Sequence, residues 1–351
     1  MKDSIVKKTR RSVNKKSIRS VTNTFPLNEQ IRSFTIQFGK ETFFERICNT
    51  MTNECLSTMS LCNIKNSINV TEEIQPFNRN RVSKKSAMNV TRDVPLRQYY
   101  GKYDKTSKKT FVYGVNNGSK TVGIGDQWRT RKVSEHMNQM MNFLSQKVKE
   151  LPEYDGMCKD LSLNHCTVLY YICDVATCKT DIDITKSKSN LNWHCDVKHN
   201  ASSGVKAHGG QCADSPTVVV TLCDSRKLDF GKRWHDRKFK TVELIDTSIL
   251  NHKDVFVLHS KDEEIDVRSG DKKQSQFQHR VIANKPSTVG KPYLSIALVF
   301  RQVSNTMMLT IDGMQFGAQT PTKFESTKEE RDKISEKFKQ IANIKREQYI
   351  N

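Results

Sequence analysis

Apolar residues recur along the chain with two different periods. Residues 133–150 carry them at helical spacing, as Val133, Met137, Met140, Met141, Leu144 and Val148. This pattern predicts an amphipathic helix whose methionine-rich face packs against a core. The apolar stretches that follow are short and rich in β-branched residues: HCTVLYYICDV, SPTVVVTLC, DVFVLH and YLSIALVFRQV. No helical pattern separates them regularly, so we expect an antiparallel sandwich or barrel rather than a doubly wound parallel sheet.

Polar segments flank this predicted sheet domain, which we place at 96–304. Residues 1–33 are basic and predict a disordered arm. The arm is either a solvated tail, a segment that contacts the phosphates of a nucleic acid, or a nuclear localisation signal. Residues 34–95 predict a short strand, a helix and a polar linker. Residues 305–351 are expected to end in a charged helix.

Composition indicates a basic protein whose cysteines are reduced. The 351 residues carry a formal net charge of +20, which favours DNA or RNA as a partner over a merely basic surface. Cys48, Cys55 and Cys62 repeat every seven residues and predict a buried stripe on one helix face. The ten cysteines show no disulfide framework, and no apolar stretch reaches the roughly twenty residues that span a bilayer. We expect an intracellular protein, nuclear or cytoplasmic, with no membrane segment.

The segment NWHCDVKHN places candidate metal ligands at the end of an apolar stretch. In a strand, residues i and i+2 point to the same side, so His194 and Asp196 share a face and Cys195 points away. His279, in FQHRV, would complete the two-histidine, one-carboxylate set that holds Fe(II) and leaves positions open for O2 and a chelating acid. There are two alternatives for His194. It could form a zinc site with Cys195 and His199, or it could form a hydrogen bond with a buried aspartate.

An arginine ends the last strongly apolar stretch. Arg301 follows SIALVF, and burying a guanidinium is unfavourable unless it has a fixed anionic partner. The distal carboxylate of 2-oxoglutarate would supply that partner, because arginine binds a carboxylate through two hydrogen bonds.

In their order along the chain, these motifs resemble the AlkB family of 2-oxoglutarate- and Fe(II)-dependent dioxygenases, over about residues 97–303. NWHCD is similar to the metal motif of that family, FQHRV to its distal histidine and LSIALVFRQ to its final strand. LSLNHCTVLYY resembles its cosubstrate strand, and PLRQYYGKYDKTSKKTFVYG its nucleotide-recognition lid. SPTVVVTLCDSRKLDF resembles the strand pair after the metal motif, with Arg226 near the substrate side.

The resemblance implies an α+β fold with a double-stranded β-helix (jelly-roll) core, flanking helices and a basic N-terminal extension. It implies that Fe(II) and O2 convert 2-oxoglutarate to succinate while a carbon–hydrogen bond is hydroxylated, which on an N-methylated base of DNA or RNA releases formaldehyde. It implies that His194, Asp196 and His279 bind iron. Arg301 and Tyr171 would bind the cosubstrate. The alternatives are a hydroxylase of a protein or small molecule, and an inactive barrel that binds nucleic acid.

The chain departs from the pattern of the family at several positions. Ser295 stands where the family has the first of two arginines, so Arg301 would hold the diacid alone or with help from Lys291. Leu169 replaces an asparagine that precedes the cosubstrate tyrosine. Val197 follows the HxD motif, where the family often has acidic residues that read the base.

Aromatic and cationic side chains alternate in one stretch before the predicted helix: Arg97, Tyr99, Tyr100, Lys102, Tyr103, Lys105, Lys108, Lys109, Phe111 and Tyr113. Enzymes that act on a base extrude it or meet it in a single strand, and aromatic rings beside cations bind single strands. We predict that Arg97, Tyr100, Tyr103, Tyr113 and Arg226 contact nucleic acid. The alternative is a hairpin with buried tyrosines and a solvated lysine edge.

Overall fold

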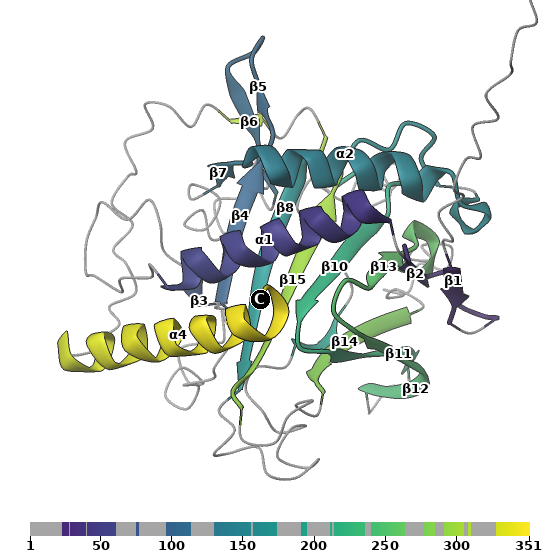
Figure 1. Ribbon diagram of the computed structural model, residues 1–351. Helices are drawn as coiled ribbons and strands as arrows, with labels where there is room; N and C mark the ends of the chain where they lie inside the picture. Colours follow the sequence, from purple (N-terminus) through teal and green to yellow (C-terminus); the bar gives the residue numbers. More distant parts are fainter. Residues whose placement is uncertain are drawn as a thin grey trace, which may run out of the picture.

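The protein is a mixed α/β structure, built mostly of strands, and Figure 1 shows its computed structural model. This much agrees with the fold class expected from the sequence. The described residues are 23–27, 29–39, 41–60, 75–76, 96–113, 130–155, 157–173, 191–194, 211–212, 214–235, 240–263, 277–284, 291–304, 308–309 and 328–351.

The largest sheet runs in the order β1-β2-β13-β10-β15-β8-β4-β3, with β7 beside β4. Its strands are β1 (Asn23–Pro26), β2 (Phe34–Gln37), β3 (Gln75–Pro76), β4 (Leu96–Gly101), β7 (Arg131–Lys132), β8 (His165–Cys173), β10 (Thr217–Cys223), β13 (Val255–Leu258) and β15 (Tyr293–Arg301). Its pairings are antiparallel, except the parallel pairing of β4 with β7. Every residue of β15 is buried, as expected for a central strand with a continuous apolar run.

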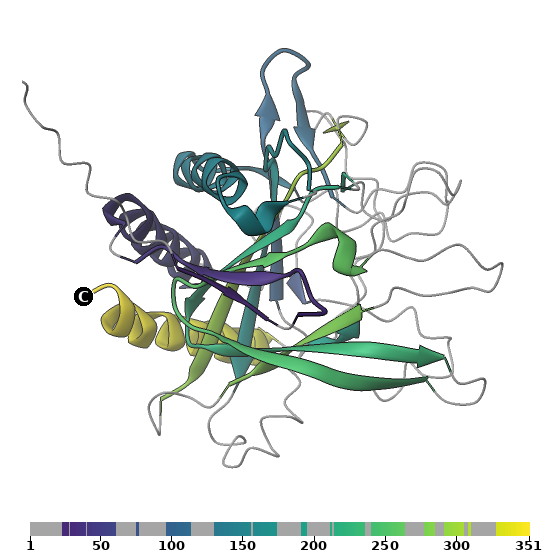
Figure 2. The same ribbon diagram turned by 90° about the vertical axis from the view of Figure 1, so that its right-hand side faces the viewer.

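Two smaller sheets accompany it in the described part of the chain. One has the order β12-β11-β14-β9 and consists of β9 (Leu191–His194), β11 (Arg226–His235), β12 (Lys240–Leu250) and β14 (Phe277–Ala283). The other has the order β16-β6-β5 and consists of β5 (Tyr103–Asp104), β6 (Lys109–Phe111) and β16 (Met308–Leu309). In the side view of Figure 2, the long ribbon of β11 and β12 lies on the side of the largest sheet away from the helices.

Three α-helices of the described residues cover one face of the largest sheet (Figure 1): α1 (Thr42–Ser60), α2 (Glu135–Lys149) and α4 (Lys328–Tyr349). Two short 3₁₀ helices, η3 (Pro152–Tyr154) and η5 (Ser260–Glu263), lie in connections. The methionine-rich face of α2 is buried, as its spacing predicts. Cys48 and Cys55 of α1 are buried too, and burial raises the pKa of Cys55 to about 12. Cys62 lies outside the described residues.

Side chains of β15 alternate between two cores. Leu294, Ile296, Leu298 and Phe300 pack with the helices in the first core. Tyr293, Ala297 and Val299 belong to a second core that also contains residues of β11 and β14. The second core therefore lies between the largest sheet and the four-stranded sheet.

The sheet begins earlier in the chain than the composition suggested. β1 falls within the predicted arm 1–33 and pairs antiparallel with β2. Ile31 is buried, and the backbone N–H groups of Arg32 and Ser33 donate to the carboxylate of Asp262. The basic composition of the arm as a whole masks this short apolar segment; residues 1–22 lie outside the described part of the chain.

No α-helix among the described residues is long and apolar enough to cross a membrane.

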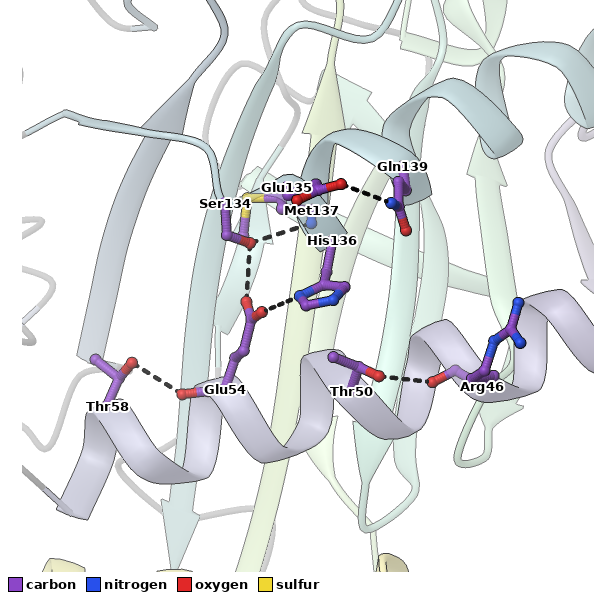
Figure 3. A network of polar contacts seen from close by, with 9 residues as sticks. All are labelled: Arg46, Thr50, Glu54, Thr58, Ser134, Glu135, His136, Met137 and Gln139. Atoms are coloured by element: carbon purple, nitrogen blue, oxygen red, sulfur yellow. Dashed lines mark hydrogen bonds and ion pairs between the residues drawn. The ribbon is translucent and has the colours of Figure 1, made fainter.

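Ser134 links α2 to α1 at the N-terminus of α2 (Figure 3). Its Oγ accepts a hydrogen bond from the N–H of Met137 at 3.1 Å and donates to Glu54 Oε2 at 2.8 Å. The other oxygen of Glu54 lies 2.6 Å from Nδ1 of His136. Ser134 thus satisfies a backbone donor of the first helical turn and ties two helices together.

Replacing Ser134 by alanine is expected to lower the free energy of unfolding by about 1 kcal/mol, because the cap and the link to Glu54 are both lost. Urea denaturation measures this change. The control is Thr50→Ala, which removes an exposed hydroxyl that bonds only the carbonyl of Arg46 in its own helix. Equal effects of the two substitutions would show that the cap contributes nothing.

Candidate functional site

His194 and His279 face each other on adjacent strands. His279 of β14 is opposite His194 of β9 in the antiparallel register, and their ring centroids lie 4.1 Å apart at an interplanar angle of 55°. Phe230 of β11 is the neighbour of His279 on its other side, with ring centroids 6.0 Å apart. Directly opposite residues of a sheet share a face, so both imidazoles lie on the same side as Phe230.

That side faces the largest sheet. Phe230 belongs to the second core, together with Val299 of β15. Arg301 comes two residues after Val299 on the same strand and therefore points to the same side. Its side chain is buried, with 6% of the residue exposed. The histidine pair and the guanidinium thus face one interior between the sheets.

Arg301 lies among a hydroxyl, an aromatic ring and an imidazole. Its Nη1 donates to Oγ1 of Thr167 at 3.4 Å, and its guanidinium carbon lies 4.4 Å from the ring centroid of Tyr113. His165 is opposite Arg301 in the pairing of β8 with β15. Burial, together with the charge of Arg301, holds the pKa of His165 well below its usual range, so this imidazole is neutral. Neither ring nitrogen of His165 has a hydrogen-bond partner.

A second buried guanidinium, that of Arg226, faces the same interior. Its Nη2 donates to Oγ1 of Thr221 at 3.0 Å, and its guanidinium carbon lies 5.1 Å from the ring centroid of Tyr171. Ser295 of β15 is opposite Tyr171 of β8, and its buried Oγ lies beside the phenol of Tyr293. Burial lowers the pKa of Arg226, yet arginine stays charged under physiological conditions.

The residues predicted to contact nucleic acid are dispersed in the structure. Tyr113 lies against Arg301, and Arg226 is buried in the interior described above. Tyr100 packs against the first core on the helix side, where burial raises its pKa above the usual range. Tyr103 of β5 has Nζ of Lys132 at 4.0 Å from its ring centroid. Arg97 belongs to β4, and its side chain lies outside the described atoms.

The distance between the two imidazole rings would allow a shared metal ion. With metal–nitrogen bonds of about 2.1 Å, two imidazoles at right angles around one ion have ring centroids roughly 4.5 Å apart, close to the observed 4.1 Å. Asp196, the predicted carboxylate ligand, lies outside the described residues. Within the described ranges, no group of three or more His, Cys, Asp or Glu side chains is placed to hold a metal.

His165, Thr167 and Thr221 line the interior but were not among the residues predicted from the sequence. His165 and Thr167 lie on the same face of β8 as the predicted Tyr171, and Thr221 of β10 is opposite Ala297 on the inner face of β15. Alternation from Tyr171 could have indicated His165 and Thr167, because every second residue of a strand shares a face. Lys291, suggested as a helper of Arg301, is exposed.

No protein-family model and no curated protein match this sequence. Among solved structures, the chain is similar to the X-ray structure of E. coli ycfD, with a TM-score of 0.21 and 9% sequence identity. The alignment covers 60% of this chain and 47% of that one, so this chain spans about half the length of its structural neighbour. Similarity at this level does not assign a fold or a function.

Proposed function

We propose that this protein is an AlkB-like dioxygenase that uses Fe(II) and 2-oxoglutarate to demethylate N-alkylated bases in DNA or RNA. The observation that carries the proposal is the apposition of His194 and His279 on adjacent strands, facing the interior that holds the buried Arg301. The carboxylate that such a site requires would come from Asp196, two residues after His194.

We also propose that the two facing sheets form a double-stranded β-helix. The antiparallel pairings of eight successive strands are nested: β8 with β15, β9 with β14, β10 with β13 and β11 with β12. A long antiparallel ribbon acquires this pattern when it wraps into a roll with its strands divided between two sheets. Such a roll would bring residues distant in the sequence, such as His194 and His279, to one site.

The chain contributes positioning and electrostatics to the proposed reaction. His194, Asp196 and His279 would hold the iron, which when bound supplies the activation of O2. Arg301 would bind a carboxylate of the cosubstrate through a charge-assisted hydrogen bond. The apolar second core would keep bulk water away from the reacting groups.

Two groups of side chains support nucleic acid as the substrate. Tyr113 lies against Arg301 beside the proposed cosubstrate, where an extruded base could stack on its ring. The hairpin of β5 and β6, at the top of Figure 1, exposes Lys105, Lys108 and Lys109. These lysines would neutralise phosphates next to the base.

Replacing Lys105, Lys108 and Lys109 together by glutamine is expected to weaken binding of a single-stranded oligonucleotide and to reduce the slope of log K against log salt by about 2. The physical reason is that each lost phosphate contact removes one counterion-release event. Fluorescence anisotropy at several salt concentrations measures the slope.

The control for this variant removes the same charge elsewhere. Lys149, Lys159 and Lys339 are exposed on other elements, and their replacement by glutamine should leave the slope nearly unchanged. Equal slopes for the two triple variants would exclude the hairpin as a phosphate-binding surface.

The proposed function is tested by oxygenating the iron-loaded protein with 2-oxoglutarate and a panel of N-methylated oligonucleotides. Mass spectrometry should detect one succinate for each methyl group lost. Turnover of 2-oxoglutarate that no oligonucleotide stimulates would instead favour a hydroxylase of a protein or small molecule. Oligonucleotide binding without iron-dependent turnover would favour an inactive binding module.

A further inference from the structure

Arg226 is a buried cation whose surroundings in the described structure contain no matching anion. The residue is 2% exposed, and no carboxylate of the described residues forms an ion pair with it. The groups that act on its charge are the phenols of Tyr171 and Tyr293. Burying a guanidinium without an anion is strongly unfavourable, so this position indicates a site for a negatively charged ligand.

Buried polar atoms gather around Arg226. Its own Nε has no hydrogen-bond partner, and the buried Oγ of Ser295 lies beside the phenol of Tyr293. Ser295 and Tyr171 are directly opposite each other in the sheet, and Arg226 lies over the Tyr171 ring and also hydrogen-bonds that side chain. The guanidinium of Arg226, the alcohol of Ser295 and the phenol of Tyr171 thus belong to neighbouring residues. All three groups can donate hydrogen bonds to a carboxylate.

We propose that Arg226, Tyr171 and Ser295 form a subsite for one carboxylate of a short dicarboxylate, whose other end lies toward Arg301 and the histidine pair. This inference rests on the proposed function, because 2-oxoglutarate is a dicarboxylate of this kind. It moves the distal contact from Arg301 to a guanidinium that comes from β11. Arg226 thereby takes a cosubstrate role instead of the nucleic-acid contact that its place in the sequence suggested.

The register of the strands sets the distance between the two threonines that the guanidinium groups contact. Arg226 donates to Thr221, which is opposite Ala297, and Arg301 donates to Thr167, which is opposite Val299. The two threonines flank β15 on either side and are offset by two residues, which places them roughly 12 Å apart at standard strand spacings. A dicarboxylate of about five carbons fits between two guanidinium groups held near these positions.

The backbone before Arg226 is held in place by several contacts. Asp224 is bound by Lys345 and Tyr349 of α4, with Nζ of Lys345 at 2.6 Å. The phenol of Tyr293 donates to the carbonyl of Ser225 at 2.8 Å. Arg226 therefore starts β11 from a fixed position, as a preorganised ligand contact requires.

The test compares two ligands that differ only in the distal group. 2-Oxoglutarate carries a carboxylate there, and 2-oxopentanoate carries a methyl group. Calorimetry, with and without Mn(II), gives the ratio of their affinities, in which contributions of the keto-acid end cancel. We expect the native protein to prefer the dicarboxylate by about a hundredfold, since a buried charge-assisted pair is lost with the monoacid.

Arg226→Met should abolish this preference and leave the affinity for 2-oxopentanoate within about twofold. Lys227→Met is the matched control, because it removes the same charge from the next residue, which is partly exposed and lies on the other face of β11. The double variant with Arg226→Met and Ser295→Arg should again prefer the dicarboxylate, by at least about tenfold. The reason is that position 295 is also next to Tyr171.

Three results would overturn the subsite: no preference for the dicarboxylate in the native protein, a preference that Arg226→Met retains, or an equal loss for both ligands. If circular dichroism shows that Arg226→Met does not fold, the same ratio is measured for Arg226→Lys. A single ammonium group should reduce the preference for the dicarboxylate and not remove it. An unchanged preference in that variant also contradicts the subsite. The measurement needs neither iron nor oxygen, so a failure of the dioxygenase proposal would leave this result standing.

Discussion

Replacing His279 by alanine is expected to reduce iron-dependent turnover of 2-oxoglutarate by about a thousandfold or more, because losing a metal ligand costs more than the 10–100-fold typical of its supporting contacts. His279 lies opposite His194 at the inner face of β14, where no neighbouring imidazole of the described residues could replace it. Oligonucleotide binding should stay within about twofold and remain sensitive to salt, because the exposed lysines are unchanged. Succinate release and fluorescence anisotropy measure the two effects.

The matched control is His136→Ala on α2. His136 is half-exposed and contacts Glu54 on the helix side of the sheet, so its loss should leave turnover unchanged. Thermal unfolding of both variants separates a loss of activity from a loss of folded protein. Turnover that persists in folded His279→Ala would reject this residue as a ligand.

Replacing Lys345 by methionine is expected to lower the free energy of unfolding by about 3–5 kcal/mol, because it leaves the buried carboxylate of Asp224 without its cation. Asp224 keeps hydrogen bonds from the backbone N–H of Leu294 and from Tyr349, but neither brings a positive charge. Urea denaturation monitored by circular dichroism measures the change.

A double-mutant cycle isolates the pair. Asp224→Asn combined with Lys345→Met should recover part of the loss, because a neutral buried pair no longer contains an uncompensated charge. Lys339→Met is the control, since Lys339 forms an exposed pair with Glu336 and should change stability by less than about 0.5 kcal/mol. Additive effects of the Asp224 and Lys345 substitutions would mean that the pair does not couple α4 to the sheet.

The local elements follow directly from sequence periodicity. The spacing of Met137, Met140 and Met141 predicts α2, and the uninterrupted apolar run around Leu298 predicts a strand. Both signals are local, because a helix face and a fully buried strand each impose their own pattern on neighbouring residues.

Strand pairing and ion pairing across the fold do not follow from such patterns. The contact of Lys345 with Asp224 joins residues far apart in the chain, and neither has a local sequence signal for its partner. The position of Arg226 depends on which face of β11 meets the largest sheet, and a shift of one residue would send it to the opposite side. Alternation could place His165 on a face of β8, but only the pairing with β15 shows that this face meets Arg301.

The iron site is tested most directly by an anaerobic titration of the protein with Fe(II) and 2-oxoglutarate, followed by visible absorption. We expect one iron per chain and a charge-transfer band that needs both the metal and the 2-oxo acid. His279→Ala should lack the band. Iron that does not bind, or a band that survives in His279→Ala, would contradict the claim that the two apposed histidines share one ferrous ion.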